Sequence, residues 1–234
     1  VTIKSKLVDA TLLTTSVPAT HTRKFEVAAN VKCIPPNELP RTAAGHRKFM
    51  VIGAGKTAMD SLNWLLESGA PAESISWVKP RDSWMFNRAF IQPGMDFFET
   101  TIGGMAAQYE TFATATSLDD FCHRMETTGA WVRLDKDVWP TMFHAAIVTH
   151  ADIDQLRTVK SVIRKGHVRR IDAEKVVLDD GEDQTSTDTL YVDCTASAIP
   201  QNVNFRKPVF ETDRITLQMI RQFQPCFSAA LLGH

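Results

Sequence analysis

The sequence is poor in cysteine and shows none of the spacings that cysteine or histidine chemistry uses. Among 234 residues it has four cysteines, at 33, 122, 194 and 226, and no C-x-x-C pair. Its seven histidines include no H-x-x-x-H pair. Zinc sites and redox-active disulfides depend on such patterns. We therefore expect no metal site, and we expect reduced cysteines that are mostly buried.

Long apolar runs and an excess of charge of one sign are also missing. No apolar stretch approaches the roughly 20 residues that a transmembrane helix needs, and no signal-peptide pattern opens the chain. The 26 basic and 27 acidic residues give a net charge of −1, which indicates neither a nucleic-acid surface nor a polybasic membrane anchor. The expectation is a cytoplasmic globular protein that binds a small-molecule substrate, with no nucleic-acid or membrane partner.

What the sequence does contain is organised around residues 48–69, KFMVIGAGKTAMDSLNWLLESG. The apolar run 49–52 predicts a buried strand, and apolar residues at helical spacing from Ala58 to Leu66 predict a helix that Gly69 ends. Between them, Gly53, Gly55 and Ala58 fit G-x-G-x-x-A, the fingerprint of dinucleotide-binding turns. The alternative is an ordinary α/β turn.

Each position of this fingerprint has a physical role. Gly53 permits the turn, Gly55 lets a pyrophosphate approach the backbone, and the small Ala58 lets the helix pack closely on the strand. The helix N-terminus adds free N–H groups and a positive dipole end. The expected phosphate-binding residues are Gly53, Ala54, Gly55, Lys56, Thr57 and Ala58.

The triplet Gly55-Lys56-Thr57 also resembles the end of a P-loop. That motif needs a glycine where this chain has Met50, inside the predicted strand, so the P-loop is excluded. Lys56 is then a residue at the helix start that can lean toward a phosphate.

A second strand, predicted at 74–78, ends in basic residues. In a doubly wound sheet this strand end meets the adenosine ribose, where an acidic residue suits NAD and basic residues suit the 2′-phosphate of NADP. Lys79 and Arg81 follow the strand, so the sequence favours NADP. Asp82 is either a ribose ligand or a turn or helix cap. Arg88 either extends the phosphate clamp or is a solvated helix residue.

The rest of the chain gives a coarser pattern. Residues 1–17 resemble strand material, 18–47 a linker, and 83–116 a helical or irregular insertion. Helices are predicted at 118–128, capped by Ser117, and at 149–158. The tryptophans are expected in the core: Trp77, Trp84, Trp131 and Trp139.

Short β-rich runs follow from residue 159 to residue 193. They predict an antiparallel meander that feeds a last buried strand at 189–193. The predicted fold class is α/β, a Rossmann-like parallel sheet with helices and an antiparallel β-meander.

These motifs resemble those of a known family. VIGAGKTAMD, the basic strand end WVKPRD, a β-meander and LYVDCTASAIP together resemble the second, NADP-binding domain of two-dinucleotide-binding flavoproteins. Flavin-containing monooxygenases and the pyridine nucleotide-disulfide oxidoreductases are its best-known members. In that family the NADP domain is inserted within the FAD domain, and an A-T-G-like triplet returns the chain to the flavin. Cys194-Thr195-Ala196 stands at that place, which implies that Thr195 and Ala196 lie near the cofactor.

The resemblance covers about residues 44–200, with three departures. No FAD fingerprint occurs in residues 1–47, the monooxygenase signature F-x-G-x-x-x-H is replaced by CIPPNELPRTAAGH, and the triplet reads C-T-A. FAD is therefore expected only in an intact, longer protein, of which this chain would be a piece.

The resemblance implies three parts and one function. Residues 44–165 would form the NAD(P)-binding domain, flanked by 1–43 and 166–234 as pieces of a split FAD domain. The chain would be the NADPH-binding portion of an FAD-dependent oxidoreductase that passes hydride from NADPH to a flavin. The alternatives are a non-catalytic NADP-sensing module and a flavin-independent NADP-dependent dehydrogenase.

Overall fold

The structure, a computed structural model, describes residues 3–9, 16–197, 208–218 and 230–231. The chain divides into two compact units: residues 1–21 with 196–234 form unit 1, and residues 22–195 form unit 2. The expected boundaries at 43/44 and 165/166 therefore differ from the structure, because residues 22–43 and 166–195 supply strands to the sheets of unit 2.

Unit 1 contains a pair of parallel strands from opposite ends of the chain. β1 (Leu7–Asp9) pairs with β14 (Arg214–Thr216). Of the strand material predicted in 1–17, Leu7–Asp9 is a strand, and Leu12-Leu13 lies outside the described residues.

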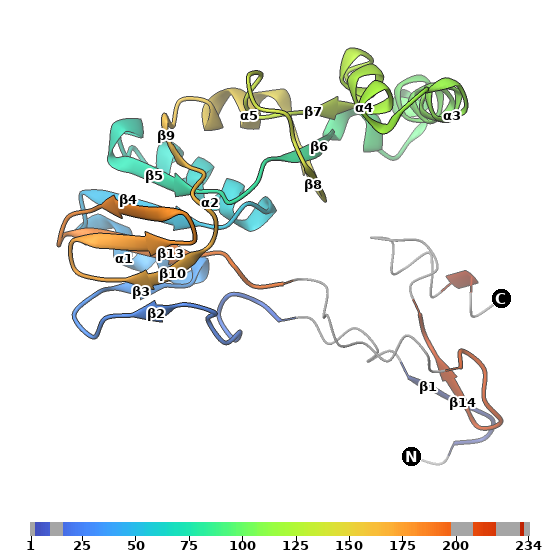
Figure 1. Cartoon of the computed structure of the whole chain (residues 1–234). Helices are drawn as coiled ribbons and strands as arrows, with labels where there is room; N and C mark the ends of the chain where they lie inside the picture. Colours follow the sequence, from blue (N-terminus) through green and yellow to red (C-terminus); the bar gives the residue numbers. More distant parts are fainter. Residues whose placement is uncertain (1–2, 10–15, 198–207, 219–229, 232–234) are drawn as a thin grey trace. The chain divides into compact units, whose positions relative to one another are not determined.

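Unit 2 is built on a sheet of five parallel strands (Figure 1), which confirms the α/β class. Their order across the sheet is β3 (Cys33–Ile34), β13 (Thr189–Asp193), β4 (Lys48–Ile52), β5 (Ile75–Val78) and β9 (Ser161–Ile163). β4 is therefore central, and its residues 49–52 are buried, as the apolar run predicted.

Successive side chains of β4 point to opposite faces of the sheet and belong to two separate cores. Val51 packs with the buried faces of α2 (Lys56–Glu67) and α5 (His150–Leu156). Ile52 packs against the strands of the meander. The parallel sheet is thus covered on both faces, by helices on one and by strands on the other.

The meander consists of β10 (Val168–Ile171), β11 (Lys175–Leu178) and β12 (Gly181–Gln184), with β2 (Glu26–Val27) at its edge. Its hairpins are antiparallel, as predicted. Ser161–Ile163, which we expected to begin it, instead forms the edge strand of the parallel sheet beside β5.

An insertion between β5 and β9 carries a second, small sheet. Its strands are β7 (Trp131–Val132), β6 (Ser83–Asn87) and β8 (Met142–Val148). The expectation of a helical or irregular segment was wrong for 83–87, where Trp84 and Met85 are both buried and face opposite sides of a strand.

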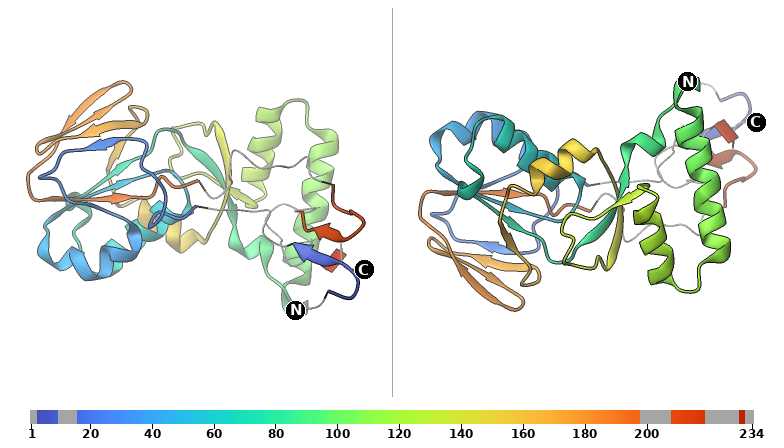
Figure 2. Two further views of the ribbon diagram at one scale, coloured as in Figure 1. Left: turned by 90° about the horizontal axis from the view of Figure 1, so that it is seen from below. Right: turned by 90° about the horizontal axis from the view of Figure 1, so that it is seen from above.

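The remainder of the insertion is helical. Ser117 caps α4 as predicted, because its hydroxyl accepts the N–H of Asp120 at 3.1 Å. Figure 2 shows α3 and α4 at the end of unit 2 opposite the meander. The helical segments are η4 (Arg88–Ile91), η5 (Met95–Phe97), η6 (Glu99–Gly103), α3 (Gly104–Thr114) and α4 (Leu118–Thr127).

Short helical turns precede β4 and β5: η1 (Pro36–Glu38), α1 (Leu39–Thr42), η2 (Ala43–Gly45) and η3 (Ala72–Ser74). Of the four tryptophans expected in the core, Trp77, Trp84 and Trp131 are buried, whereas Trp139 is 37% exposed.

None of the helices in the described part of the chain has the length and apolar character that a membrane span needs.

Candidate functional site at the glycine turn

The glycine turn lies where the strand order of the parallel sheet reverses. From β4 the chain passes to β5 on one side, while β13, the last strand of this sheet, lies on the other side of β4. The amide of Cys194 donates to the carbonyl oxygen of Ile52 at 2.8 Å, so the chain after β13 runs beside the turn. In open α/β sheets, ligands bind outside the carboxyl ends of the strands at such a reversal.

Gly53 is fixed by its neighbours on both adjacent strands. Its φ is +137°, and a Cβ there would lie 2.7 Å from the carbonyl oxygen of Cys194. Its N–H donates to the carbonyl oxygen of Val78 at 3.0 Å, and its own carbonyl oxygen accepts a hydrogen bond from the indole N–H of Trp77 at 2.7 Å. The fold itself therefore requires glycine at this position.

Gly55 differs from Gly53 because the fold does not require it. It precedes α2 as the N-cap residue with φ −92° and ψ −179°, an extended conformation that any residue adopts. No described atom lies within 4 Å of where its Cβ would be. Within the described residues, no side chain caps α2, so the N–H groups of its first turn have no side-chain acceptor there.

The other residues of the fingerprint occupy different environments. Ala58 is fully buried against the parallel sheet, where a larger side chain would push α2 away. Lys56 forms an exposed ion pair with Asp60 on the surface of α2. Thr57 is exposed, and Ala54 is half-buried.

The strand end expected to hold the ribose contains a buried ion pair. The Lys79 ammonium is fully buried and contacts Oδ1 of Asp82 at 2.8 Å, while Oδ2 of Asp82 accepts Nε of Arg164 at 2.8 Å. Lys79 therefore does not present its charge to a phosphate, contrary to our expectation. Asp82 is neither a cap nor a free ribose ligand, since both of its oxygens are occupied by cations.

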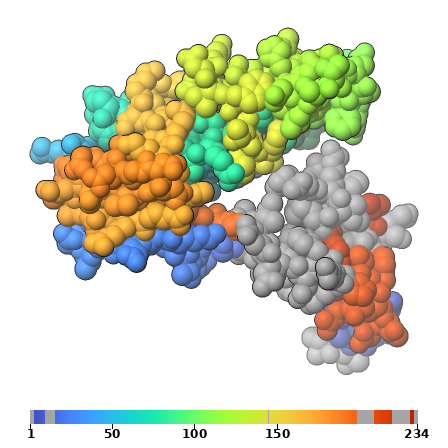
Figure 3. Space-filling view, in the orientation of Figure 1, coloured from blue at the N-terminus to red at the C-terminus, as the bar shows by residue number. Residues whose placement is uncertain are grey.

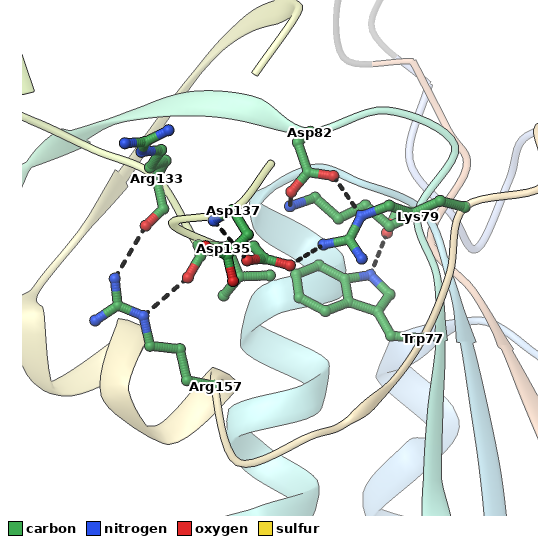
Figure 4. A network of polar contacts seen from close by, with 10 residues as sticks. Trp77, Lys79, Asp82, Arg133, Asp135, Asp137 and Arg157 are labelled. Carbon is green, nitrogen blue, oxygen red and sulfur yellow. Dashed lines mark hydrogen bonds and ion pairs between the residues drawn. The ribbon is translucent and has the colours of Figure 1, made fainter. Parts of the chain in front are cut away.

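Burial and charge act together on this pair (Figure 4). Burial lowers the pKa of Lys79 below its ordinary value, against the opposing effect of Asp82. Burial would raise the pKa of Asp82, but the hydrogen bonds and charges of Arg164 and Lys79 outweigh it and lower that pKa. Arg164 also contacts Asp135 at 3.1 Å, so two cations and two carboxylates balance one another.

Of the two basic residues Lys79 and Arg81 that follow β5, Arg81 is the one available to bind an anion. Its side chain is exposed and forms no hydrogen bond or ion pair with another described residue. Arg88 lies beyond the far end of β6, roughly 16 Å along the strand at about 3.3 Å per residue. It donates to the carbonyl of Ile147 at 3.3 Å and does not extend a clamp formed by Arg81.

The end of β13 is held by a buried carboxylate. Asp193 is 1% exposed, and its Oδ1 accepts the N–H and the hydroxyl of Thr195 at 3.0 and 2.7 Å. Its Oδ2 contacts Nε of Arg23 at 3.2 Å. Thr195 is thereby placed at the same sheet edge as the turn, whereas Ala196 begins unit 1.

The thiol beside the turn is unsuited to nucleophilic chemistry. Cys194 is buried, and burial raises its pKa to about 12, so the thiolate is scarce near neutral pH. Cys33 and Cys122 are also free thiols, and Cys226 lies outside the described residues. In the part of the chain that the structure describes, no three His, Cys, Asp or Glu side chains gather to hold a metal ion.

The known proteins that this chain resembles are longer than it is, and their descriptions name no activity. No family model matches this chain. It is 42% identical over 234 residues to proteins described as uncharacterized from Mycobacterium tuberculosis and Mycobacterium bovis. The match covers 100% of this chain and 43% of each relative, so the chain spans less than half the length of the curated relatives it matches.

Proposed function

We propose that unit 2 binds NADPH at the glycine turn, as the NADP-binding portion of an FAD-dependent oxidoreductase resembling flavin-containing monooxygenases. The observation that supports this most is the location of Gly53 and Gly55 at the reversal of strand order. There the N-terminus of α2, which no described side chain caps, would supply N–H groups and a positive dipole end to a pyrophosphate. The open space at Gly55 admits the phosphates to the backbone.

The preference for NADPH over NADH follows from the charges at the end of β5. Asp82 is 5% exposed, and its carboxylate contacts two cations. It is therefore not available to a ribose hydroxyl. Arg81 is exposed and unpaired among the described residues, and its planar guanidinium suits a phosphate. The 2′-phosphate would therefore meet Arg81, without the help from Lys79 or Arg88 that we expected.

The proposed role of FAD concerns a protein longer than this chain. The relatives are more than twice as long as this chain, which leaves room in them for a flavin domain. In such a protein NADPH would pass hydride to FAD, and the chemistry would be that of the cofactors. A flavin absorption band in a purified protein of the relatives' full length supports this role. Colourless protein that binds NADPH would instead support a sensing module or a flavin-independent dehydrogenase in the cytoplasm.

Substitution of Gly55 tests dinucleotide binding without disturbing the fold. Gly55→Val should abolish NADPH binding in calorimetry while the melting temperature stays close to that of the wild type, because the new side chain fills the space for the phosphates. Gly55→Ser should act in the same direction and keeps a good N-cap. Gly45→Val is the matched control, because Gly45 also has no described atom within 4 Å of its Cβ but lies outside the turn. Unchanged NADPH affinity in Gly55→Val would overturn the proposal.

A further inference from the structure

The indole of Trp77 joins the glycine turn to a buried ionic network. Trp77 lies in β5, is fully buried, and donates its Nε1–H to the carbonyl oxygen of Gly53 at 2.7 Å. The ammonium of Lys79 lies 5.0 Å from the centroid of the same ring. One side chain therefore contacts the turn through its N–H and a buried cation through its π-system.

The hydrogen bond of Trp77 sets the direction of a second group in the turn. The carbonyl of Gly53 and the N–H of Ala54 belong to one planar trans peptide, in which the two groups point in opposite directions. Because Trp77 holds the carbonyl, it also aims the Ala54 N–H to the opposite side. That N–H is among the backbone groups that would contact a phosphate at this turn.

The network continues from Trp77 into the insertion. Asp82 links Lys79 to Arg164 at 2.8 Å on each side, and Arg164 contacts Oδ2 of Asp135 at 3.1 Å. Figure 4 shows Trp77, Lys79, Asp82 and Asp135 close together in one network of polar contacts.

Asp135 lies in the loop 133–137, the first part of the connection from β7 to β8, and this loop is held in place. The guanidinium of Arg157 donates to the carbonyls of Leu134 and Arg133 at 2.8 and 3.1 Å. Oδ1 of Asp135 accepts the N–H of Asp137 at 3.0 Å. The outer end of the network is therefore attached to an ordered segment of the insertion.

We propose that Trp77 is a positioning residue for the dinucleotide, and that the series Lys79, Asp82, Arg164 and Asp135 couples the glycine turn to the loop 133–137. The dinucleotide part rests on the proposed function. A change at the loop alters the support of Lys79 beneath the indole and thereby the orientation of the Gly53–Ala54 peptide. Coupling is reciprocal, so a ligand at the turn also stabilises the loop.

Two tryptophan variants test the positioning role. Trp77→Phe keeps a buried ring and removes the N–H, so NADPH should bind roughly two- to tenfold more weakly, the effect of one hydrogen bond. Trp84→Phe is the matched control, because Trp84 is also buried and its Nε1 has no partner among the described residues. Trp84→Phe should leave NADPH affinity within about twofold of the wild type.

Two aspartate variants test the coupling. Asp135→Asn removes one of the two carboxylate charges that hold Arg164 but keeps an oxygen for the Asp137 N–H, and it should weaken NADPH binding by up to about fivefold. Asp137→Asn makes the same charge change at an exposed neighbour and should have no effect. In the Trp77→Phe background, the effect of Asp135→Asn should disappear, because the link to the turn is already broken.

Hydrogen exchange without ligand separates this proposal from the proposed function. The amides of Gly53 and Ala58 should exchange faster in Trp77→Phe and Asp135→Asn than in Trp84→Phe and Asp137→Asn. Equal exchange in all four variants would overturn the positioning role even if NADPH binds. If Trp77→Phe and Asp135→Asn exchange faster but the wild-type protein binds no NADPH, the results would support control of the turn by Trp77 and overturn the proposed function.

Discussion

The carboxyl edge of the parallel sheet and the helical segment 88–116 of the insertion use their side chains in opposite ways. At the sheet edge, charged groups are buried and paired: Lys79 is fully buried and Asp82 is 5% exposed. In 88–116, large apolar side chains face outward, with Met95 82%, Tyr109 68% and Phe112 73% exposed. Figure 3 shows the green atoms of this segment on the surface of unit 2.

The difference shows in which part of the protein each group is held by more than one contact. At the sheet edge, several independent contacts fix each group, so that one substitution leaves a charge or a backbone group without its partner. In α3, Thr111 is buried while Tyr109 and Phe112 are not, so that single substitutions there remove few contacts. The cost of a substitution should therefore fall from the sheet edge to the insertion.

The largest effect is expected from Asp82→Ala. It leaves the ammonium of Lys79 buried without its carboxylate, which typically costs about 3–5 kcal/mol of unfolding free energy. Urea unfolding measures this loss. Asp60→Ala breaks the exposed ion pair with Lys56, where Asp60 is 58% exposed, and should cost less than about 1 kcal/mol. Similar losses in the two variants would remove the contrast between buried and exposed pairs.

The next effect is expected from Gly53→Ala. Its Cβ would meet the Cys194 carbonyl at 2.7 Å, and its φ of +137° is also unfavourable for alanine. Gly94→Ala, in the insertion, has an unfavourable φ of +105° but open space around the Cβ. The unfolding free energy should fall by about 1–3 kcal/mol more in Gly53→Ala, the usual cost of overpacking. Equal losses would show that the turn yields to the added methyl group.

The smallest effect is expected from Phe112→Ser. Its ring is 73% exposed and meets Phe121 edge-on at a centroid distance of 5.6 Å. Surface substitutions usually change the unfolding free energy by less than about 0.5 kcal/mol. Thermal and urea unfolding should therefore be nearly unchanged. A loss above about 2 kcal/mol would mean that this face supports the fold of unit 2 after all.

Local patterns were sufficient to predict the central βαβ unit. The apolar run 49–52, the glycines and the helical spacing after them are contiguous in the chain, and the structure has β4, the turn and α2 at these positions. The hydroxyl cap of Ser117 was predictable for the same reason. Spacing also identified the meander, apart from β9, whose short β-rich run does not reveal whether its partner is parallel or antiparallel.

The buried network was not predictable, because its members are distant in sequence. Arg164 meets Asp82 across 82 positions, and no local pattern marks such a pair. Lys79 and Arg81 looked alike as basic residues after a strand, yet one points into the protein and the other toward solvent. Trp77 was expected in the core, but nothing in the sequence indicated that its N–H supports the turn.

Cofactor choice tests the central claim most directly, by calorimetry with NADPH and NADH on the whole chain. A hydrogen bond to a charged group contributes about 1.5–3 kcal/mol, so one contact of Arg81 with the 2′-phosphate implies a preference for NADPH of roughly ten- to a hundredfold. Arg81→Ala should remove most of that preference by weakening NADPH alone, and Arg88→Ala, at the other end of β6, should change neither affinity. Equal binding of NADH and NADPH by the wild type, or an equal loss of both in Arg81→Ala, would contradict the account.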